Sequence, residues 1–464
     1  MRLARPLPLL AFALALVLAS APAGARAGDL PALPAYLSAK DDSFAWEAAK
    51  EYSAPGATVT AIRLTSQTWQ GIAWKHWLMV IVPEERDHAK DALLVIGGGR
   101  NRDNPPDELS GETLLLLGQA VKTGTVVAVL SQVPNQPLFE NLREDALIAF
   151  TFQKFIETKD ETWPCLLPMT RSAIRAMDAV QAFTAKDGGQ KVERFFVTGA
   201  SKRGWTTWLT AAADRRVCAI APMVIDVLNM PKQMPHQLEM LGAYSEQIRD
   251  YTRLGLPQKV SDAEAKQLLD LVDPYTFRDR LTMPKLIVLG TNDPYWAVDA
   301  INLYFPDLPG EKYIHYVPNA GHGLGPSALE AVSAFYKTVL DGEARPRFSW
   351  RFAADAEAGT FTIESADAPK QVELWTAASP DKDFRNDRWS GVPVQQAGEG
   401  RYVVRVPRPA EGFAAAHVAL TFTSSLGHDY KLCTNVEVFG ATPAPPAKKG
   451  GEGKKGKLFS RVGE

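Results

Sequence analysis

A serine near the middle of the chain has the surroundings of an enzymatic nucleophile. Ser201 comes shortly after Arg194–Thr198, an apolar run of strand type, and opens a stretch with helical spacing. Gly199 and Gly204 flank it, as in the sharp strand-to-helix turn, the nucleophile elbow, that exposes a serine hydroxyl. The common spacing is Gly-x-Ser-x-Gly, and here Arg203 holds the place of the second glycine, so the match is imperfect. A serine at a helix start also serves as an N-cap, and the two roles are compatible.

Two later residues supply the partners that such a serine needs. A serine hydroxyl attacks only when a base removes its proton, and the elbow type of hydrolase has the chain order serine, acid, histidine. Asp293 and His322 follow in that order, each just after a short apolar run that predicts a strand. We therefore expect Ser201 as nucleophile, His322 as general base and Asp293 as the acid that orients the histidine. Asp226, after the preceding strand, is the alternative acid; otherwise it would orient substrate or cap a helix.

The negative charge that develops during acyl transfer needs two hydrogen-bond donors. One should be the backbone N–H of Lys202, and the other should come from Gly98 or Gly99, in the glycine-rich loop after the strand Ala92–Ile96. This loop lacks the Lys-Ser/Thr ending of a phosphate-binding loop. The side chains of Lys202 and Arg203 would assist the oxyanion, hold a substrate carboxylate, or be ordinary helix-surface charges, and the sequence leaves these three roles open.

Four aromatic residues flank the three catalytic segments, and they are either pocket walls or packing beneath the elbow: Trp205, Trp208, Tyr295 and Trp296. We count Trp205, Tyr295 and Trp296, with Arg203 and Asp226, as candidate substrate-binding residues. No zinc, dinucleotide or kinase signature occurs, so we expect neither a cofactor nor a metal. The three cysteines lack metal-ligand spacing, and their odd number leaves at least one outside any disulfide.

Composition limits the class of protein and of partner. The 464 residues are 46% hydrophobic and 22% charged, as in soluble globular proteins, and the net charge is -2. This balance gives no reason to expect nucleic acid as a partner, so the expected partner is a small-molecule or peptide substrate. The oligomeric state stays open.

The elements that must position these residues alternate between strands and helices, which predicts a mostly parallel sheet covered on both faces. We expect an α/β-hydrolase domain over 28–344, opened by an antiparallel hairpin after a Pro- and Ala-rich segment, 28–54, that wraps the surface. The long stretch 227–280 should form a helical cap. Short alternating runs then predict an all-β sandwich over 345–440, followed by a disordered basic tail over 441–464.

The first 27 residues have the pattern of a signal peptide. Two arginines precede the apolar run Leu7–Leu18, and Ala25–Ala27 is a small-residue cleavage site. The run is shorter than the ~20 residues that a membrane-spanning helix needs. We expect a periplasmic or secreted protein without stable membrane insertion.

Several long strings resemble the PhoPQ-activated pathogenicity-related protein family over about residues 35–440. They are Gly199–Trp205, Gly290–Trp296, Asn319–His322, Trp163–Met169 and Arg175–Asp178. The resemblance implies an exported α/β-hydrolase-like protein with the same Ser201, Asp293 and His322. A eukaryotic branch of the family is an autocrine proliferation repressor with dipeptidyl-peptidase-like activity. Gly-x-Ser-Lys-x-Gly also resembles the Gly-x-Ser-Arg-x-Gly elbow of glucuronoyl esterases, which use the basic residue in the oxyanion hole.

These observations predict a serine hydrolase that cleaves an acyl bond, and the family branch favours an aminopeptidase or dipeptidyl-peptidase type. Such a peptidase needs a carboxylate for the free amine, and Glu239, Glu246 and Asp250 in the cap are candidates. A carboxylesterase, sugar-ester types included, is the first alternative. The second is a non-catalytic signalling or binding protein on a hydrolase scaffold.

Overall fold

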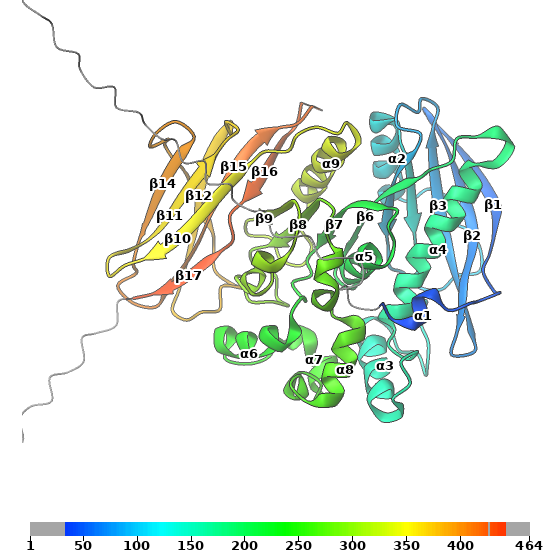
Figure 1. Cartoon of the computed structure of the whole chain (residues 1–464), viewed down its shortest axis with the longest axis horizontal. Helices are drawn as coiled ribbons and strands as arrows, with labels where there is room; N and C mark the ends of the chain where they lie inside the picture. The colour runs from blue at the N-terminus through cyan, green and yellow to red at the C-terminus, as the bar shows by residue number, and fades with distance from the viewer. Residues whose placement is uncertain (1–32, 426, 442–464) are drawn as a thin grey trace, which may run out of the picture.

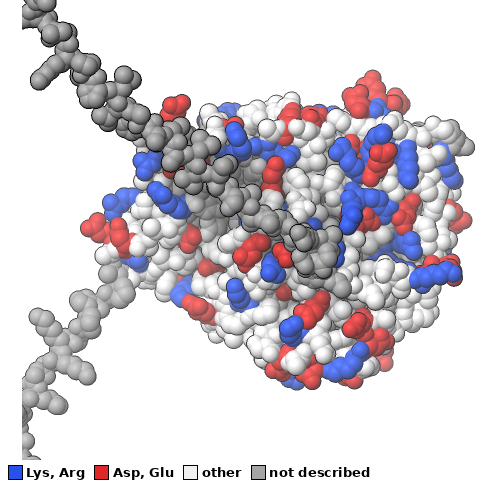
Figure 2. All heavy atoms as spheres, viewed as in Figure 1, with Lys and Arg blue, Asp and Glu red and all other residues white. Residues whose placement is uncertain are grey.

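The structure is a computed structural model that describes residues 33–425 and 427–441. The predicted signal peptide and all of the predicted tail beyond its first residue lie outside this range. Among the described residues, no helix has both the length and the apolar character to cross a membrane. On the face seen in Figure 2, basic and acidic side chains are intermixed, as the small net charge would suggest.

A large twisted sheet forms the centre of the molecule (Figure 1). At one end of the sheet, the first four strands are paired antiparallel to one another. From the fourth to the ninth strand, all neighbours are parallel. In order across the sheet these strands are β1 (Ala45–Ala54), β2 (Ala57–Trp69), β3 (Ile72–Pro83), β5 (Val126–Leu130), β4 (Asp91–Ile96), β6 (Arg194–Ala200), β7 (Val217–Met223), β8 (Lys285–Gly290) and β9 (Lys312–Val317). This order, with its crossover helices, is the α/β-hydrolase fold. The segment expected to wrap the surface instead forms helix α1 (Ala35–Ser38) and the edge strand β1.

Helices cover both faces of this sheet, and each face has its own apolar core. The helices α4 (Leu166–Thr184) and α5 (Lys202–Ala213) pack together on one face. The helices α2 (Gly111–Thr123) and α9 (Pro326–Leu340) lie on the other, where Ser333 Oγ donates to Gln119 Oε1. The strands β4 and β8 are buried along their whole length, as is usual for strands covered on both faces.

A helical cap interrupts the alternation between β7 and β8. It contains α6 (Met230–Leu241), α7 (Arg249–Thr252) and α8 (Ala263–Val272), with short 3-10 turns between them. Together with α3 (Glu144–Thr158), these helices lie below the sheet in Figure 1. Both α7 and α8 contact α3, and residues of the cap and of α3 line one cavity.

The C-terminal part is a two-layered β structure that continues the hydrolase sheet. One layer holds β10 (Phe348–Ala354), β11 (Ala358–Ser365) and β14 (Arg401–Pro407). The other holds β12 (Gln371–Ser379), β13 (Ser390–Pro393), β15 (Phe413–Thr423), β16 (Asp429–Cys433) and β17 (Glu437–Gly440). In this second layer β16 pairs with β9 through Cys433 and Ile314, so the two sheets join edge to edge. None of the three cysteines forms a disulfide.

Candidate active site

Ser201 lies at a strained turn between β6 and α5. Its φ of 58° and ψ of -129° are angles that a non-glycine residue rarely adopts, and such strain often marks a functional position. The flanking glycines are required by close packing of the helix on the sheet. A Cβ at Gly199 would be 2.8 Å from the carbonyl oxygen of Arg203, and one at Gly204 would be 2.6 Å from Ile225 Cγ2. Gly204, one position later than in the common spacing, is thus the residue that lies too close to its neighbours for a side chain. The usual glycine position can therefore be occupied by Arg203.

His322 and Asp293 are brought together by the loops after β9 and β8. The imidazole Nδ1 lies 2.9 Å from Asp293 Oδ2 and 3.1 Å from Oδ1. The Tyr295 backbone N–H donates to Asp293 Oδ1 at 2.9 Å, and the Tyr295 ring lies against the imidazole, tilted by 30°, with centroids 4.3 Å apart. His322 Nε2 is buried without a partner among the described residues, and His322 lines the same cavity as Ser201. This nitrogen is therefore available as a base.

Asp226 has a different partner. Its carboxylate accepts a hydrogen bond of 2.5 Å from the Tyr304 hydroxyl, and the residue is only 4% exposed. Burial raises the pKa of Asp226 to about 7, with a smaller rise from the nearby Asp293 and Asp299, against the lowering effect of the Tyr304 hydrogen bond. Of the two candidate acids, the structure thus brings Asp293 to His322, and Asp226 is not among the residues that line the cavity.

The glycine loop, which should supply one oxyanion donor, contacts the side chain of Arg203. A Cβ at Gly98 would be 2.5 Å from an Arg203 guanidinium nitrogen, and Lys202, whose N–H is the other expected donor, begins α5 directly before Arg203. The carbonyls of Gly98 and Gly99 accept from Gln132 N and Gln136 Nε2, at 2.7 and 3.2 Å. Their N–H groups donate to no other described residue. These glycines do not themselves line the main cavity, which Lys202 does.

Both basic side chains after the serine are held in ion pairs. Arg203 makes two hydrogen bonds with Glu144, of 2.7 and 2.8 Å, and donates to the Val133 carbonyl at 2.5 Å. Lys202 Nζ lies 3.0 Å from Glu144 and 3.2 Å from Asp145. Partial burial raises the pKa of Glu144, but Arg203 and Lys202 outweigh it and hold the value at about 2. The guanidinium of Arg203 braces the glycine loop and does not line the cavity.

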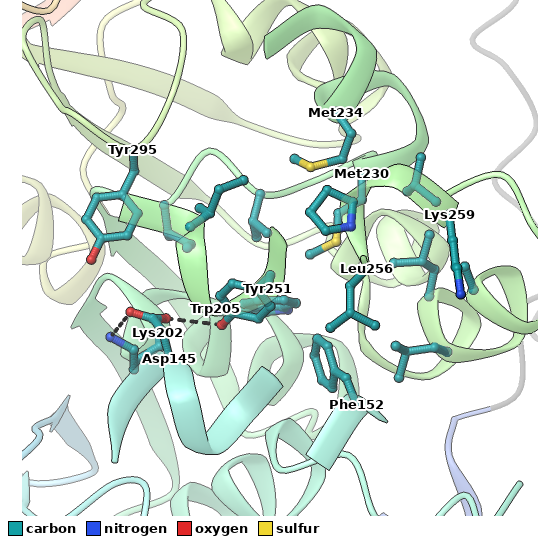
Figure 3. Close-up of a pocket in the computed structure, with 18 of the residues that line it drawn as sticks. Asp145, Phe152, Lys202, Trp205, Met230, Met234, Tyr251, Leu256, Lys259 and Tyr295 are labelled. Atoms are coloured by element: carbon teal, nitrogen blue, oxygen red, sulfur yellow. Dashed lines mark hydrogen bonds and ion pairs between the residues drawn. The ribbon is translucent and has the colours of Figure 1, made fainter. Parts of the chain in front are cut away.

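A cavity of about 540 Å³ opens between Ser201 and the cap (Figure 3). Its charged end holds Lys202 and Asp145, near Tyr295, whereas Lys259 lies at the opposite side of the view. Apolar side chains form most of the wall between these ends: Phe152, Ile156, Trp205, Val224, Ile225, Val227, Met230, Met234, Ile248, Leu256, Val260, Leu268, Leu269 and Trp296. Trp208, on α5, is buried in the core and does not line the cavity.

Asp145 is a cavity residue that the sequence did not single out. It sits in the first turn of α3, where an acidic residue is common in any helix, so no sequence signal distinguished it. Its carboxylate pairs with Lys202 and accepts from the Tyr251 hydroxyl at 3.1 Å. The cap carboxylates considered earlier do not line the cavity: Glu239, Glu246 and Asp250.

Comparison with known proteins gives a family and a set of related folds. Residues 33–385 match the family described as PhoPQ-activated pathogenicity-related protein. The chain is 30% identical over 442 residues to autocrine proliferation repressor protein A of Dictyostelium discoideum, which covers 87% of this chain and 89% of that protein.

Among solved structures, the chain is similar to acetyl xylan esterases from Thermoanaerobacterium sp. JW/SL YS485 and Paenibacillus sp. R4. Both matches have a TM-score of 0.48. The first esterase is 15% identical, and the match covers 66% of this chain and 91% of the esterase. The second is 14% identical, and the match covers 67% of this chain and 92% of the esterase. A glucuronoyl esterase from Solibacter usitatus has a TM-score of 0.38 and 13% identity, over 66% of this chain and 91% of its own.

Proposed function

We propose that this chain, which belongs to the family of PhoPQ-activated pathogenicity-related proteins, is an exported serine hydrolase that cleaves carboxylic esters with an apolar acyl or alcohol group. The observation that carries the proposal is the apolar cavity that Ser201 and His322 share, beside the contact between His322 and Asp293. A volume of about 540 Å³ is within the range of small-molecule sites.

The reaction proceeds through an acyl-enzyme. His322 Nε2 takes the hydroxyl proton as Ser201 Oγ attacks the ester carbonyl carbon, and the Asp293 carboxylate stabilises the resulting imidazolium. The oxyanion accepts from the backbone N–H of Lys202 and from that of Gly98 or Gly99. The alcohol leaves with the proton from His322. A water that His322 deprotonates then releases the carboxylic acid and restores the serine.

Charge in the cavity supports an ester over a peptide with a free amino terminus. An amine would need an unpaired carboxylate near Ser201, and Asp145 is already paired with Lys202 and Tyr251. Lys202, Arg203, Glu144 and Asp145 pair with one another, so none of these four charges is left to bind an ion. We therefore prefer the carboxylesterase to the peptidase that the sequence alone favoured.

A covalent probe and a substrate series test the proposal. We expect a fluorophosphonate to label the purified protein and the Ser333→Ala control on α9, and not Ser201→Ala. Hydrolysis of p-nitrophenyl esters should improve from acetate to octanoate, by up to about fourfold in kcat/KM per added methylene, because each buried methylene is worth about 0.8 kcal/mol.

Three outcomes would contradict the proposal, each in a different way. Folded protein that is not labelled, or that is still labelled after Ser201→Ala, would exclude the serine hydrolase and favour the binding or signalling alternative. Aminoacyl-proline amides cleaved faster than any ester would restore the peptidase. Glucuronoyl or acetyl sugar esters that surpass the octanoate would exclude the apolar specificity.

A further inference from the structure

A loop of the C-terminal β structure reaches the two loops that carry Asp293 and His322. This loop, residues 380–389, joins β12 to β13. Its partners, Asn292 and Asn319, lie 70 to 95 residues away along the chain, so the contacts are long-range. Phe384 and Trp389, both 1% exposed, anchor the loop in the core.

Asn292, directly before Asp293, makes the first contact. Its side-chain Nδ2 faces three carbonyl oxygens of the 380–389 loop, those of Phe384, Arg385 and Asp387, at 3.3, 3.1 and 2.7 Å. Its Oδ1 accepts from the Thr291 hydroxyl at 2.8 Å, so the amide orientation satisfies both ends of the group. The residue next to the catalytic acid is therefore held by main chain of the C-terminal β structure.

Asn319, in the loop that leads to His322, makes the second contact. Its amide pairs reciprocally with the main chain of Trp389: Nδ2 donates to the carbonyl at 3.0 Å, and Oδ1 accepts from the N–H at 2.8 Å. Thr291 Oγ1 accepts from the Asn319 N–H at 2.8 Å and so links the two loops to each other. With a φ of 60°, Asn319 is in the left-handed region, which asparagine and glycine tolerate.

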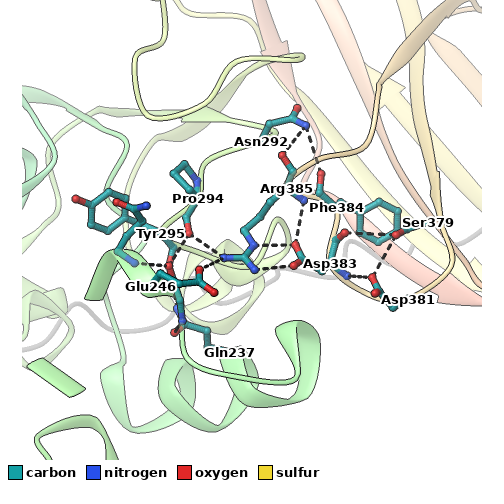
Figure 4. Close-up of polar contacts among 12 residues, drawn as sticks. Gln237, Glu246, Asn292, Pro294, Tyr295, Ser379, Asp381, Asp383, Phe384 and Arg385 are labelled. Atoms are coloured by element: carbon teal, nitrogen blue, oxygen red, sulfur yellow. Dashed lines mark hydrogen bonds and ion pairs between the residues drawn. The ribbon is translucent and has the colours of Figure 1, made fainter. Parts of the chain in front are cut away.

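Arg385 extends the contact to the cap (Figure 4). Its guanidinium is bound to Asp383 at 2.6 and 2.8 Å, and a second edge lies 3.4 Å from both the Pro294 carbonyl and Glu246. The Ser245 hydroxyl donates to the same Pro294 carbonyl at 2.7 Å. The acid loop is thus fixed between the cap and the C-terminal β structure.

We infer that the C-terminal β structure is part of the catalytic unit, because its 380–389 loop fixes the acid and base loops through the positioning residues Asn292 and Asn319. Neither side chain touches the reacting atoms. The contacts hold Asp293 and His322 in register, and misplacement of a catalytic group by about 1 Å costs about a hundredfold in rate. The inference rests on the proposed function.

The test compares Asn292→Ala and Asn319→Gly with the control Asn302→Ala. Glycine at 319 removes the amide but keeps the left-handed backbone accessible. Asn302 makes the same kind of contact between the same two parts, through Nδ2 to the Val436 carbonyl at 2.9 Å, away from the triad loops. The kinetics use the best ester of the series, with active sites titrated by the fluorophosphonate.

We expect each triad-loop variant to lose about tenfold to a hundredfold in kcat with KM within about twofold. The acid limb of its pH–rate profile should move to lower pH, because a loosely held Asp293 carboxylate stabilises the protonated form of His322 less. The Asn302 variant should lower Tm and leave kcat and the profile unchanged. Triad-loop variants that lose only Tm would overturn the inference alone, whereas a wild-type protein without labelling or hydrolysis would overturn the proposed function and this inference with it.

Discussion

Two carboxyl groups at the ends of neighbouring strands have different environments. Asp293, after β8, is hydrogen-bonded to His322 Nδ1, whereas Asp226, after β7, accepts a hydrogen bond from the Tyr304 hydroxyl in the core. Burial raises the pKa of Asp226 to about 7. The two residues can therefore be separated experimentally by their effects on stability and on activity.

The free energy of unfolding should depend on pH through Asp226. Below about pH 4 the carboxyl is protonated in both the folded and the unfolded chain. Between about pH 4 and 7 only the unfolded chain ionises it, so this group makes stability fall as pH rises. Asp226→Asn removes that loss, so the Tm of the variant minus that of wild type should increase from pH 5 to pH 8. The corresponding change in the free energy of unfolding is about a few kcal/mol. Thermal unfolding of both proteins at the two pH values measures it.

The matching control is Asp293→Asn. It should retain the fold and lose about 10³–10⁴-fold in kcat, because the amide no longer holds the required histidine tautomer. Asp226→Asn should keep fluorophosphonate labelling. A Tm difference for Asp226→Asn that does not change with pH would contradict the stability argument, and the reverse pattern of activities would exchange the roles of the two acids.

At the scale of elements, Glu144 joins two helices. It begins α3, yet its side chain binds Arg203 and Lys202 at the start of α5. Its φ of 50° is unusual for a residue that is not glycine, and such strain persists only where surrounding contacts maintain it. The contacts of Glu144 with Arg203 and Lys202 therefore connect α5, the helix that follows Ser201, with α3, which forms part of the cavity wall.

Glu144→Gln should lower the free energy of unfolding at pH 7 by about 1–3 kcal/mol, through lost charged hydrogen bonds. We expect the lower half of this range, because the side chain is 40% exposed. The pKa of about 2 is below the ordinary value of 4.5, so this stabilisation is present above about pH 4.5 and is lost as pH falls toward 2. Urea unfolding at pH 7 and pH 3 should therefore show a smaller difference at pH 3.

Glu157→Gln provides the comparison on the same helix. Glu157 is exposed, and its partners among the described residues are neighbours on α3, so its replacement should change the unfolding midpoint little. A Glu144 variant that behaves like the Glu157 variant at both pH values would show that the α3–α5 contact contributes nothing.

Sequence patterns predicted elements better than they predicted contacts. The α/β-hydrolase fold follows from apolar runs that alternate with helical spacing, and Ser201, Asp293 and His322 each stand just after such a run. Strand β1 was missed because its Ala, Glu and Lys residues are uncommon in strands, and its pairing with β2 decides its conformation. The roles of Lys202 and Arg203 stayed open because their partners on α3 lie 57 or more residues away.

For the whole molecule, the question is whether the hydrolase part stands alone. The sequence suggested two units, with a boundary near residue 344. In the structure, residues 341–347, between α9 and β10, form neither helix nor strand. The sheet nevertheless continues from β9 to β16, α9 contacts β16, and residues of both parts belong to one apolar core. The boundary in the chain is therefore not a boundary in the packing.

A chain that ends at residue 344 should accordingly fail as an enzyme. It would expose the edge of β9 and the apolar face of α9, and an uncovered strand edge promotes aggregation. It would also lack the main-chain partners of Asn292 and Asn319. We expect it to be aggregated in size-exclusion chromatography, with fluorophosphonate labelling per folded molecule reduced at least about tenfold. A chain that ends at residue 441 keeps every described β strand and should label as the wild type does. Monomeric, folded 1–344 protein that labels at the wild-type rate would contradict this, since the C-terminal β structure would then be dispensable for both packing and catalysis.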